Sequence, residues 1–122
     1  MPLTVDVEKK REGVFIVSPK GRIDSDSYQQ LKERFEPILV KGTEIVVLNM
    51  DGVYYISSAG LSVILSARKF LEQNNSTFVI SNLQPQVKKV FDILKTLPSQ
   101  AVFKDMQEVD EYLDAIQTKD IE

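Results

Sequence analysis

Apolar residues along this chain recur with the two-residue period of a strand in some segments and with the roughly 3.6-residue period of a helix in others. The sequence of these segments predicts the order of the strands and helices. Residues 4–8 alternate polar and apolar side chains, which indicates a half-exposed strand. Residues 14–17 indicate a second, more buried strand, and the continuous apolar run at residues 45–48 is typical of a strand covered on both faces. The charged turn at residues 9–12, closed by Gly13, predicts an antiparallel hairpin that places the first strand at a sheet edge.

Helical spacing of apolar residues predicts a helix after the second strand and after each later one. Asp26 with Gln29, or Ser27 with Gln30, is expected to cap the start of a first helix, and Pro37 is its weak point. The run Ser18-Pro19-Lys20-Gly21 is expected to end the second strand. The remaining elements are a helix from about Ser58 to Asn74, a strand at 77–81, a helix from Pro85 that ends before Pro98, a short strand at about 101–103, and a last helix capped by Asp105.

This order predicts an α/β fold with right-handed parallel crossovers. We expect a single domain with a mixed, mostly parallel sheet of four to five strands, an N-terminal antiparallel edge strand and about four helices. The domain is expected to span residues 1–117, with residues 118–122 as a frayed C-terminal tail.

Composition narrows the function. The chain has 122 residues, enough for one core, and contains neither cysteine nor histidine. Their absence removes the usual Ser/His and Cys/His nucleophile pairs and nearly all zinc sites, and leaves only carboxylate, lysine, tyrosine or hard-cation chemistry. We expect a protein that is not an enzyme and holds no metal or cofactor. The net charge of -3 argues against direct nucleic-acid binding. No apolar run is long enough for a membrane span and no signal peptide is visible, which predicts a cytoplasmic protein.

The stretch from Asp51 to Leu61 is the expected functional site. It is predicted to be a loop that leaves the buried central strand and enters the second helix, with two adjacent hydroxyls, Ser57 and Ser58, at the junction. Free backbone N–H groups at a helix start favour an anion there. Ser58 is the predicted N-cap, a role that contributes about 1 kcal/mol to stability.

The residues Val53-Tyr54-Tyr55-Ile56-Ser57-Ser58-Ala59-Gly60-Leu61 resemble the signature of the STAS domain, specifically that of the bacterial anti-sigma factor antagonists. The resemblance covers nearly the whole chain. Residues 21–24 look like the first loop of that family, residues 45–50 like its central strand and residues 84–97 like its late helix.

The resemblance implies a phosphorylation switch. Ser58, two residues before Gly60, matches the phosphate-accepting serine. Ser57 is the second choice because it adds a competing hydroxyl, at the position where relatives often keep an acid. Asp24 matches a first-loop aspartate associated with partner recognition, although a turn role is equally compatible. The implied partner-binding residues are Asp24, Asp51, Tyr54, Tyr55, Ser57, Ser58, Ala59, Gly60 and Ser62.

The same resemblance implies the partners. The unphosphorylated domain binds an anti-sigma factor that is also an ATP-dependent serine kinase, and a sigma factor is thereby released. Phosphorylation reverses this, and a metal-dependent serine phosphatase resets it, so the domain itself catalyses nothing. The alternative is a STAS scaffold that is never phosphorylated, an accessory subunit of a larger assembly such as a transporter or signalling complex. Neither reading predicts an oligomeric state.

Overall fold

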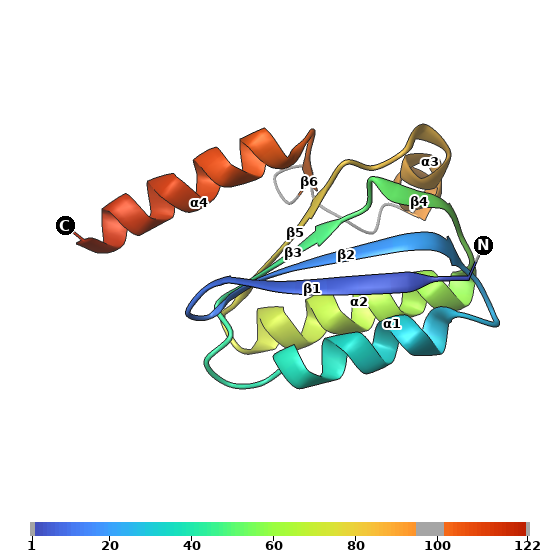
Figure 1. Ribbon diagram of the computed structural model, residues 1–122, viewed down its shortest axis with the longest axis horizontal. Coiled ribbons are helices and arrows are strands. Elements are labelled where there is room, and N and C mark those ends of the chain that lie inside the picture. The colour runs from blue at the N-terminus through green and yellow to red at the C-terminus, as the bar shows by residue number, and fades with distance from the viewer. Residues whose placement is uncertain (1, 95–101, 122) are drawn as a thin grey trace.

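The structure, a computed structural model, describes residues 2–94 and 102–121. Its elements alternate between strands and helices along most of the chain (Figure 1). They are β1 (Thr4–Arg11), β2 (Val14–Ile23), α1 (Tyr28–Phe35), the short 3-10 helix η1 (Glu36–Ile38), β3 (Ile45–Asn49), β4 (Gly52–Ile56), α2 (Ser58–Gln73), β5 (Thr77–Ser81), α3 (Pro85–Leu94), β6 (Val102–Phe103) and α4 (Met106–Ile121).

The sheet confirms the predicted α/β fold and its mixed topology. Its order is β1-β2-β3-β5-β6, with β1 antiparallel to β2 at one edge and the other neighbours parallel. The described residues form six strands rather than four to five, because β4 adds a sixth that pairs with the far part of β2.

The predicted end of the second strand at residues 18–21 is wrong. β2 continues to Ile23, and its two halves have different parallel partners: Val14–Val17 pair with β3, and Lys20–Ile23 pair with β4. Pro19 lies in the gap between these two pairings, where a missing N–H removes no bond from that ladder. A proline and a glycine therefore fail to end the strand, since β4 supports the chain beyond them.

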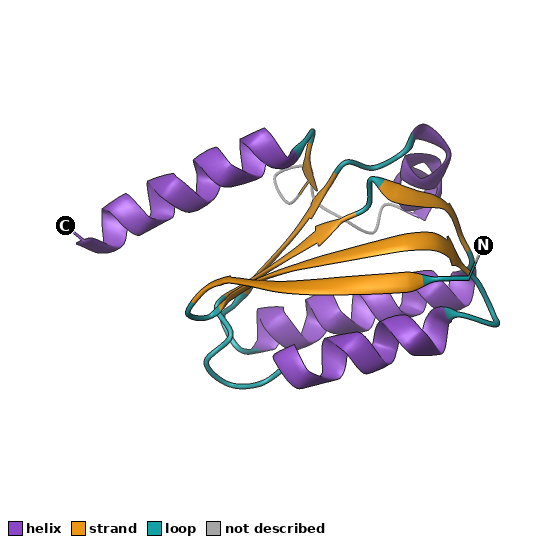
Figure 2. Cartoon of the chain, in the orientation of Figure 1, coloured by secondary structure: helices purple, strands orange, loops and turns teal. Residues whose placement is uncertain are grey.

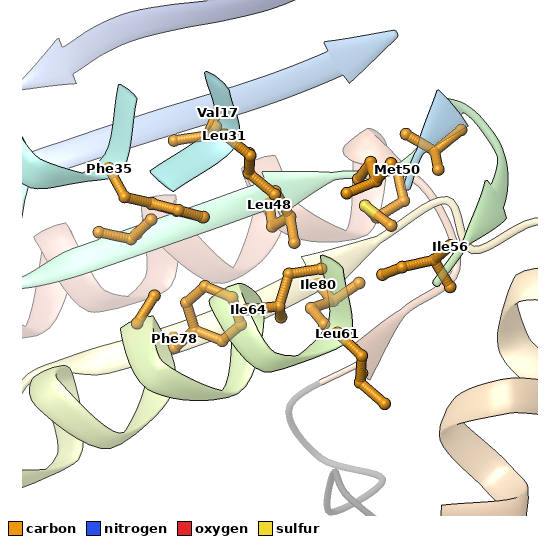
Figure 3. Packing of buried hydrophobic residues seen from close by; sticks show 14 of the residues in the cluster. Val17, Leu31, Phe35, Leu48, Met50, Ile56, Leu61, Ile64, Phe78 and Ile80 are labelled. Carbon is orange, nitrogen blue, oxygen red and sulfur yellow. The ribbon is translucent and has the colours of Figure 1, made fainter. Parts of the chain in front are cut away.

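Helices cover both faces of the sheet. Figure 2 shows α1 and α2 together on one face, α4 on the other, and α3 beside β4. Alternate residues of β3 face the two layers: Val46 and Leu48 belong to the core under α1 and α2, whereas Ile45 and Val47 pack with Val109 of α4. Figure 3 shows the larger core, in which Leu48 and Ile80 of the sheet meet Ile64 and Leu61 of α2. The central strand is covered on both faces, as predicted.

The first helix ends early for the predicted reason. α1 stops at Phe35 and the chain continues as the 3-10 helix that contains Pro37. The predicted capping box is wrong, because Ser27 occupies the N-cap position without a side-chain capping bond. Its hydroxyl instead shares its one proton between the carbonyl of Arg22 (2.6 Å) and the carboxylate of Asp24 (3.0 Å), and the first of these bonds depends on where β2 ends.

The last helix is capped as predicted. The N–H of Glu108 donates to Asp105 Oδ1 (3.0 Å), and the Glu108 carboxylate accepts from the N–H of Lys104 (2.7 Å). α4 continues to Ile121, past Thr118 where the frayed tail is expected, and the domain bounds of 1–117 stay a prediction. The expected stop at Pro98 and the residues 95–97 of the predicted late helix lie outside the described residues.

Candidate functional site

The stretch after the central strand is a strand rather than the predicted loop. β3 ends at Asn49 and is followed by a turn in which the N–H of Val53 donates to the Met50 carbonyl (3.0 Å). β4 then runs parallel to the last part of β2, in the same direction as β3. Ser57 leaves β4 with its N–H bonded to the Ile23 carbonyl (2.8 Å). Regular pairing therefore holds the serine pair beside the first loop.

The two serines have different structural roles. Ser57 is the N-cap of α2: its backbone is extended, and its hydroxyl accepts from the N–H of Gly60 (3.2 Å). Ser58 is the first residue of the helix and is exposed. The prediction that Ser58 caps the helix is wrong, because β4 extends through Ile56 and places the handover one residue earlier.

The helix start retains donors for an anion. The Ser57 hydroxyl and carbonyl satisfy the N–H groups of Gly60 and Leu61. In the described part of the chain no hydrogen bond involves the N–H groups of Ser58 and Ala59. The first turn of α2 also contains no acidic side chain, so its positive end is not neutralised locally.

Gly60 is buried and serves packing. A Cβ at this position would collide with the Ile23 side chain, and it would lie 3.1 Å from both the Ile23 carbonyl oxygen and Ile56 Cγ1. The glycine therefore lets the start of α2 approach the ends of β2 and β4 closely. Although it is among the predicted partner-binding residues, the structure places it beneath the surface.

The carboxylate of Asp24 organises the first loop. It accepts from the N–H groups of Asp26 (3.0 Å) and Ser27 (3.1 Å), and Arg22 Nε lies 3.5 Å from its second oxygen. The Asp26 N–H, then the Ser27 hydroxyl and Arg22, hold the pKa of Asp24 below its ordinary value. This geometry supports the turn reading of Asp24, while its partly exposed side chain still borders the Ser57–Ser58 junction.

Arg22 is a member of the site that the sequence analysis did not single out. Its guanidinium carbon lies 4.2 Å from the centroid of the Tyr55 ring, within cation–π range. Because the same side chain reaches Asp24, Arg22 connects β4 with the first loop. Its place in the run Gly21-Arg22-Ile23-Asp24 is the only signal that the sequence offers.

A groove lies along α2 and begins at Ala59, the residue after the serine pair. It has a volume of about 370 Å³ and lies between α1 and α2, with Ala59 and Ser62 near Ser58 and Tyr28 and Phe35 on the opposite wall. Ala59 and Ser62 of the predicted set therefore share one surface with Ser58.

The remaining predicted residues lie at different distances from the Ser57–Ser58 pair. Tyr54 and Tyr55 are exposed on β4, which leads directly to the serine pair. Asp51 lies at the opposite end of that strand, up to roughly 20 Å along the chain from Ser57, where its carbonyl accepts from Gln84 Nε2 (2.7 Å). Gly60 is thus buried and Asp51 lies at the far end of β4, while the other predicted residues lie on the first loop, on β4 and at the start of α2.

The described residues show neither a metal-binding cluster nor a membrane-spanning helix. Among residues 2–94 and 102–121, no group of three or more acidic side chains is arranged to hold a metal ion. None of the helices in those ranges has the length and apolar character needed to cross a bilayer.

Comparison with known proteins gives consistent matches. The model of the STAS domain matches residues 7–109. BtrV of Bordetella bronchiseptica, a candidate anti-sigma factor antagonist, is 38% identical over 93 residues, which cover 76% of this chain and 78% of BtrV.

The fold is similar to that of SpoIIAA, an anti-sigma factor antagonist of Bacillus. The unphosphorylated form aligns with a TM-score of 0.78 at 16% identity over 92% of this chain and 97% of SpoIIAA. The phosphorylated form aligns with a TM-score of 0.74 at 15% identity over 90% and 99%.

Proposed function

Because the chain belongs to the STAS domain family, among the anti-sigma factor antagonists, which are non-enzymatic regulators, we propose that it is a phosphorylation-switched binding partner of an anti-sigma factor. Its unphosphorylated form binds an anti-sigma factor that is also a serine kinase, and a sigma factor is released. Phosphorylation of Ser58 ends that binding, and a metal-dependent serine phosphatase restores it. These steps place the protein in the bacterial cytoplasm, where transcription is regulated.

The observation that carries the proposal is the exposed hydroxyl of Ser58 on the first residue of α2. A kinase reaches this hydroxyl without unfolding the helix start, because the cap is made by Ser57 instead. The N–H groups of Ser58 and Ala59 and the helix dipole favour the charge of a phosphate there. SpoIIAA, of similar fold, is known in both an unphosphorylated and a phosphorylated form.

The switch acts on the partner rather than on the fold. A phosphate adds about two negative charges at pH 7 to a surface that continues into the α1–α2 groove. A partner packed over Ser58 would meet added bulk, a desolvation cost and unpaired charge at once. Asp24 and the tyrosines of β4 belong to the same surface in this proposal.

The proposal is tested by incubating the purified chain with ATP and its anti-sigma factor kinase and measuring intact mass. We expect one added phosphate on the wild type and none on Ser58→Ala. Ser57→Ala should also gain one phosphate, because it keeps the Ser58 hydroxyl and loses only the side chain that caps α2. Ser58→Asp should bind the kinase more weakly than the wild type, whereas Ser58→Asn, of similar size and no charge, should bind about as well.

Two results would change the assignment. A phosphate that persists on Ser58→Ala and disappears on Ser57→Ala would move the acceptor to Ser57. Stable binding of a partner with no phosphorylation, and with equal affinity for Ser58→Asp, would favour the scaffold alternative.

A further inference from the structure

A bulge in β4 exposes two consecutive aromatic side chains. Gly21 of β2 pairs with Val53, and Arg22 pairs with Tyr55, so Tyr54 has no partner on β2. Without the extra residue, strict alternation would turn one of the two tyrosines inward. With it, Val53 and Ile56 both face the core, while Tyr54 is 60% and Tyr55 42% exposed.

Arg22 completes a surface that we call the β4 patch, made of Lys20, Arg22, Tyr54 and Tyr55. Arg22 lies over the Tyr55 ring, and its side chain is 57% exposed. A hollow of about 400 Å³ lies beside it, lined by Lys20, Gly21, Arg22, Gly52 and Tyr54. Tyrosine and arginine are among the residue types that contribute most of the binding energy in protein interfaces, and here both are exposed around a hollow.

The charges of the β4 patch indicate what it takes. Arg22 uses Nε for Asp24, and the planar guanidinium offers further donors in a fork that suits a carboxylate. Lys20 lies at the rim of the same hollow, although it also borders a second hollow that contains Asp6 and Asp51, so Arg22 is the main cation. The hollow itself is floored by glycines and the flank of Tyr54, which suits an apolar side chain.

Ser58 lies beyond the end of β4, four residues after Tyr54, on the helix that follows. Ser58 does not line the hollow beside Tyr54, whereas its neighbours Ala59 and Ser62 line the α1–α2 groove. A charge added at Ser58 therefore acts first on the junction and on that groove.

We propose that the β4 patch is a docking surface whose contribution does not depend on phosphorylation, and that it takes a protein loop presenting a carboxylate to Arg22 beside an apolar side chain seated in the hollow. This rests on the proposed function for the identity of the binding protein, the anti-sigma factor kinase. The Ser58 region supplies the switch, and the β4 patch supplies the constant part of the affinity.

The test measures the affinity of the anti-sigma factor kinase by titration calorimetry for the 122-residue chain as wild type, Arg22→Gln, Ser58→Asp and the double variant, with three further single variants. Arg22→Gln should weaken binding about tenfold in both the Ser58 and the Ser58→Asp background. Arg22→Glu should weaken it further, because it opposes the partner's carboxylate, and Tyr54→Ala should cause a similar loss by emptying one wall of the hollow. The matched control is Lys9→Gln, which removes an exposed cation elsewhere on the sheet and should change affinity less than twofold.

The Tyr54→Ala variant distinguishes a loss of contacts with the kinase from damage to the first loop. The Asp24 carboxylate contacts Asp26, Ser27 and Arg22 and not Tyr54, so Tyr54→Ala should leave the first loop intact, and the Asp24 carboxyl should keep its lowered pKa by NMR titration. A loss of affinity with an unchanged Asp24 titration supports docking.

The failures of the two proposals differ. Full affinity in both Arg22→Gln and Tyr54→Ala, or a loss confined to the unphosphorylated background, overturns the docking surface while Ser58→Asp still reports the switch. Equal affinity of Ser58→Asp and wild type, with a loss in Arg22→Gln, overturns the switch and leaves the docking surface standing.

Discussion

The hydroxyl of Ser57 accepts a hydrogen bond from the N–H of Gly60 at 3.2 Å, and this contact separates two adjacent serines into a cap and an exposed site. The Ser57 hydroxyl caps the first turn of α2, so the side chain of the neighbouring Ser58 is not needed as a cap. The separation makes the structural and regulatory roles independently measurable.

The first prediction concerns this pair. Ser57→Ala should lower the free energy of unfolding by about 1 kcal/mol, because it removes the acceptor for the Gly60 N–H. Ser58→Ala should change it by less than about 0.5 kcal/mol, because its side chain is exposed and makes no capping bond. Urea denaturation of both variants checks this, and equal losses would mean that the two hydroxyls share the cap.

The second prediction concerns a negative charge at Ser58. Ser58→Asp should raise stability by about 0.3–1 kcal/mol at low ionic strength, because the residue opens α2 and no acidic side chain in the first turn already interacts with the dipole. The gain should shrink with added salt, and uncharged Ser58→Asn should show none of this salt dependence. Thermal melts at two salt concentrations measure it; a destabilised Ser58→Asp would contradict a phosphate that acts outward only.

The third prediction concerns Gly60. Gly60→Ala should destabilise the fold by a net 1–2 kcal/mol, roughly, because the new Cβ meets Ile23 and Ile56 and this outweighs the helix propensity gained. Ser62→Ala on the exposed side of the same helix is the control and should be nearly neutral. A more stable Gly60→Ala protein would show that α2 shifts freely away from the end of β2.

The fourth prediction concerns the pH dependence that Asp24 introduces. Its pKa is lowered in the folded chain, so it contributes stability above its ordinary pKa, about 3.9, and that contribution is lost as the pH falls through the folded value. Wild type should therefore exceed Asp24→Asn in stability near neutral pH, and the difference should narrow below about pH 4.

NMR titration of the Asp24 carboxyl gives the direct check. Ser27→Ala should raise the Asp24 pKa toward its ordinary value, because it removes a hydroxyl 3.0 Å from the carboxylate. A pKa at or above the ordinary value in the wild type would contradict the turn described for the first loop.

The spacing of apolar residues along the chain predicts most of the strands and helices of the fold. The runs at 14–17 and 45–48 and the helical faces of α1 and α2 follow from side-chain chemistry, and so does the break at Pro37. β4 was not predicted because its support is the far end of β2, some thirty residues earlier in the chain, and strand pairing between distant segments leaves no local period. The same missing strand shifted the expected cap from Ser57 to Ser58 and hid the bulge that exposes Tyr54 and Tyr55.

Residue types and their spacing determined by themselves that this chain forms an α/β domain without histidine or cysteine chemistry and that its serine pair lies at a helix start. Tertiary structure alone decided which serine caps the helix, that Gly60 is buried, and that Arg22 lies over Tyr55 while it reaches Asp24. The reason is that amphipathic order depends on each residue and its near neighbours, whereas register, bulges and cross-strand stacking depend on how distant strands align.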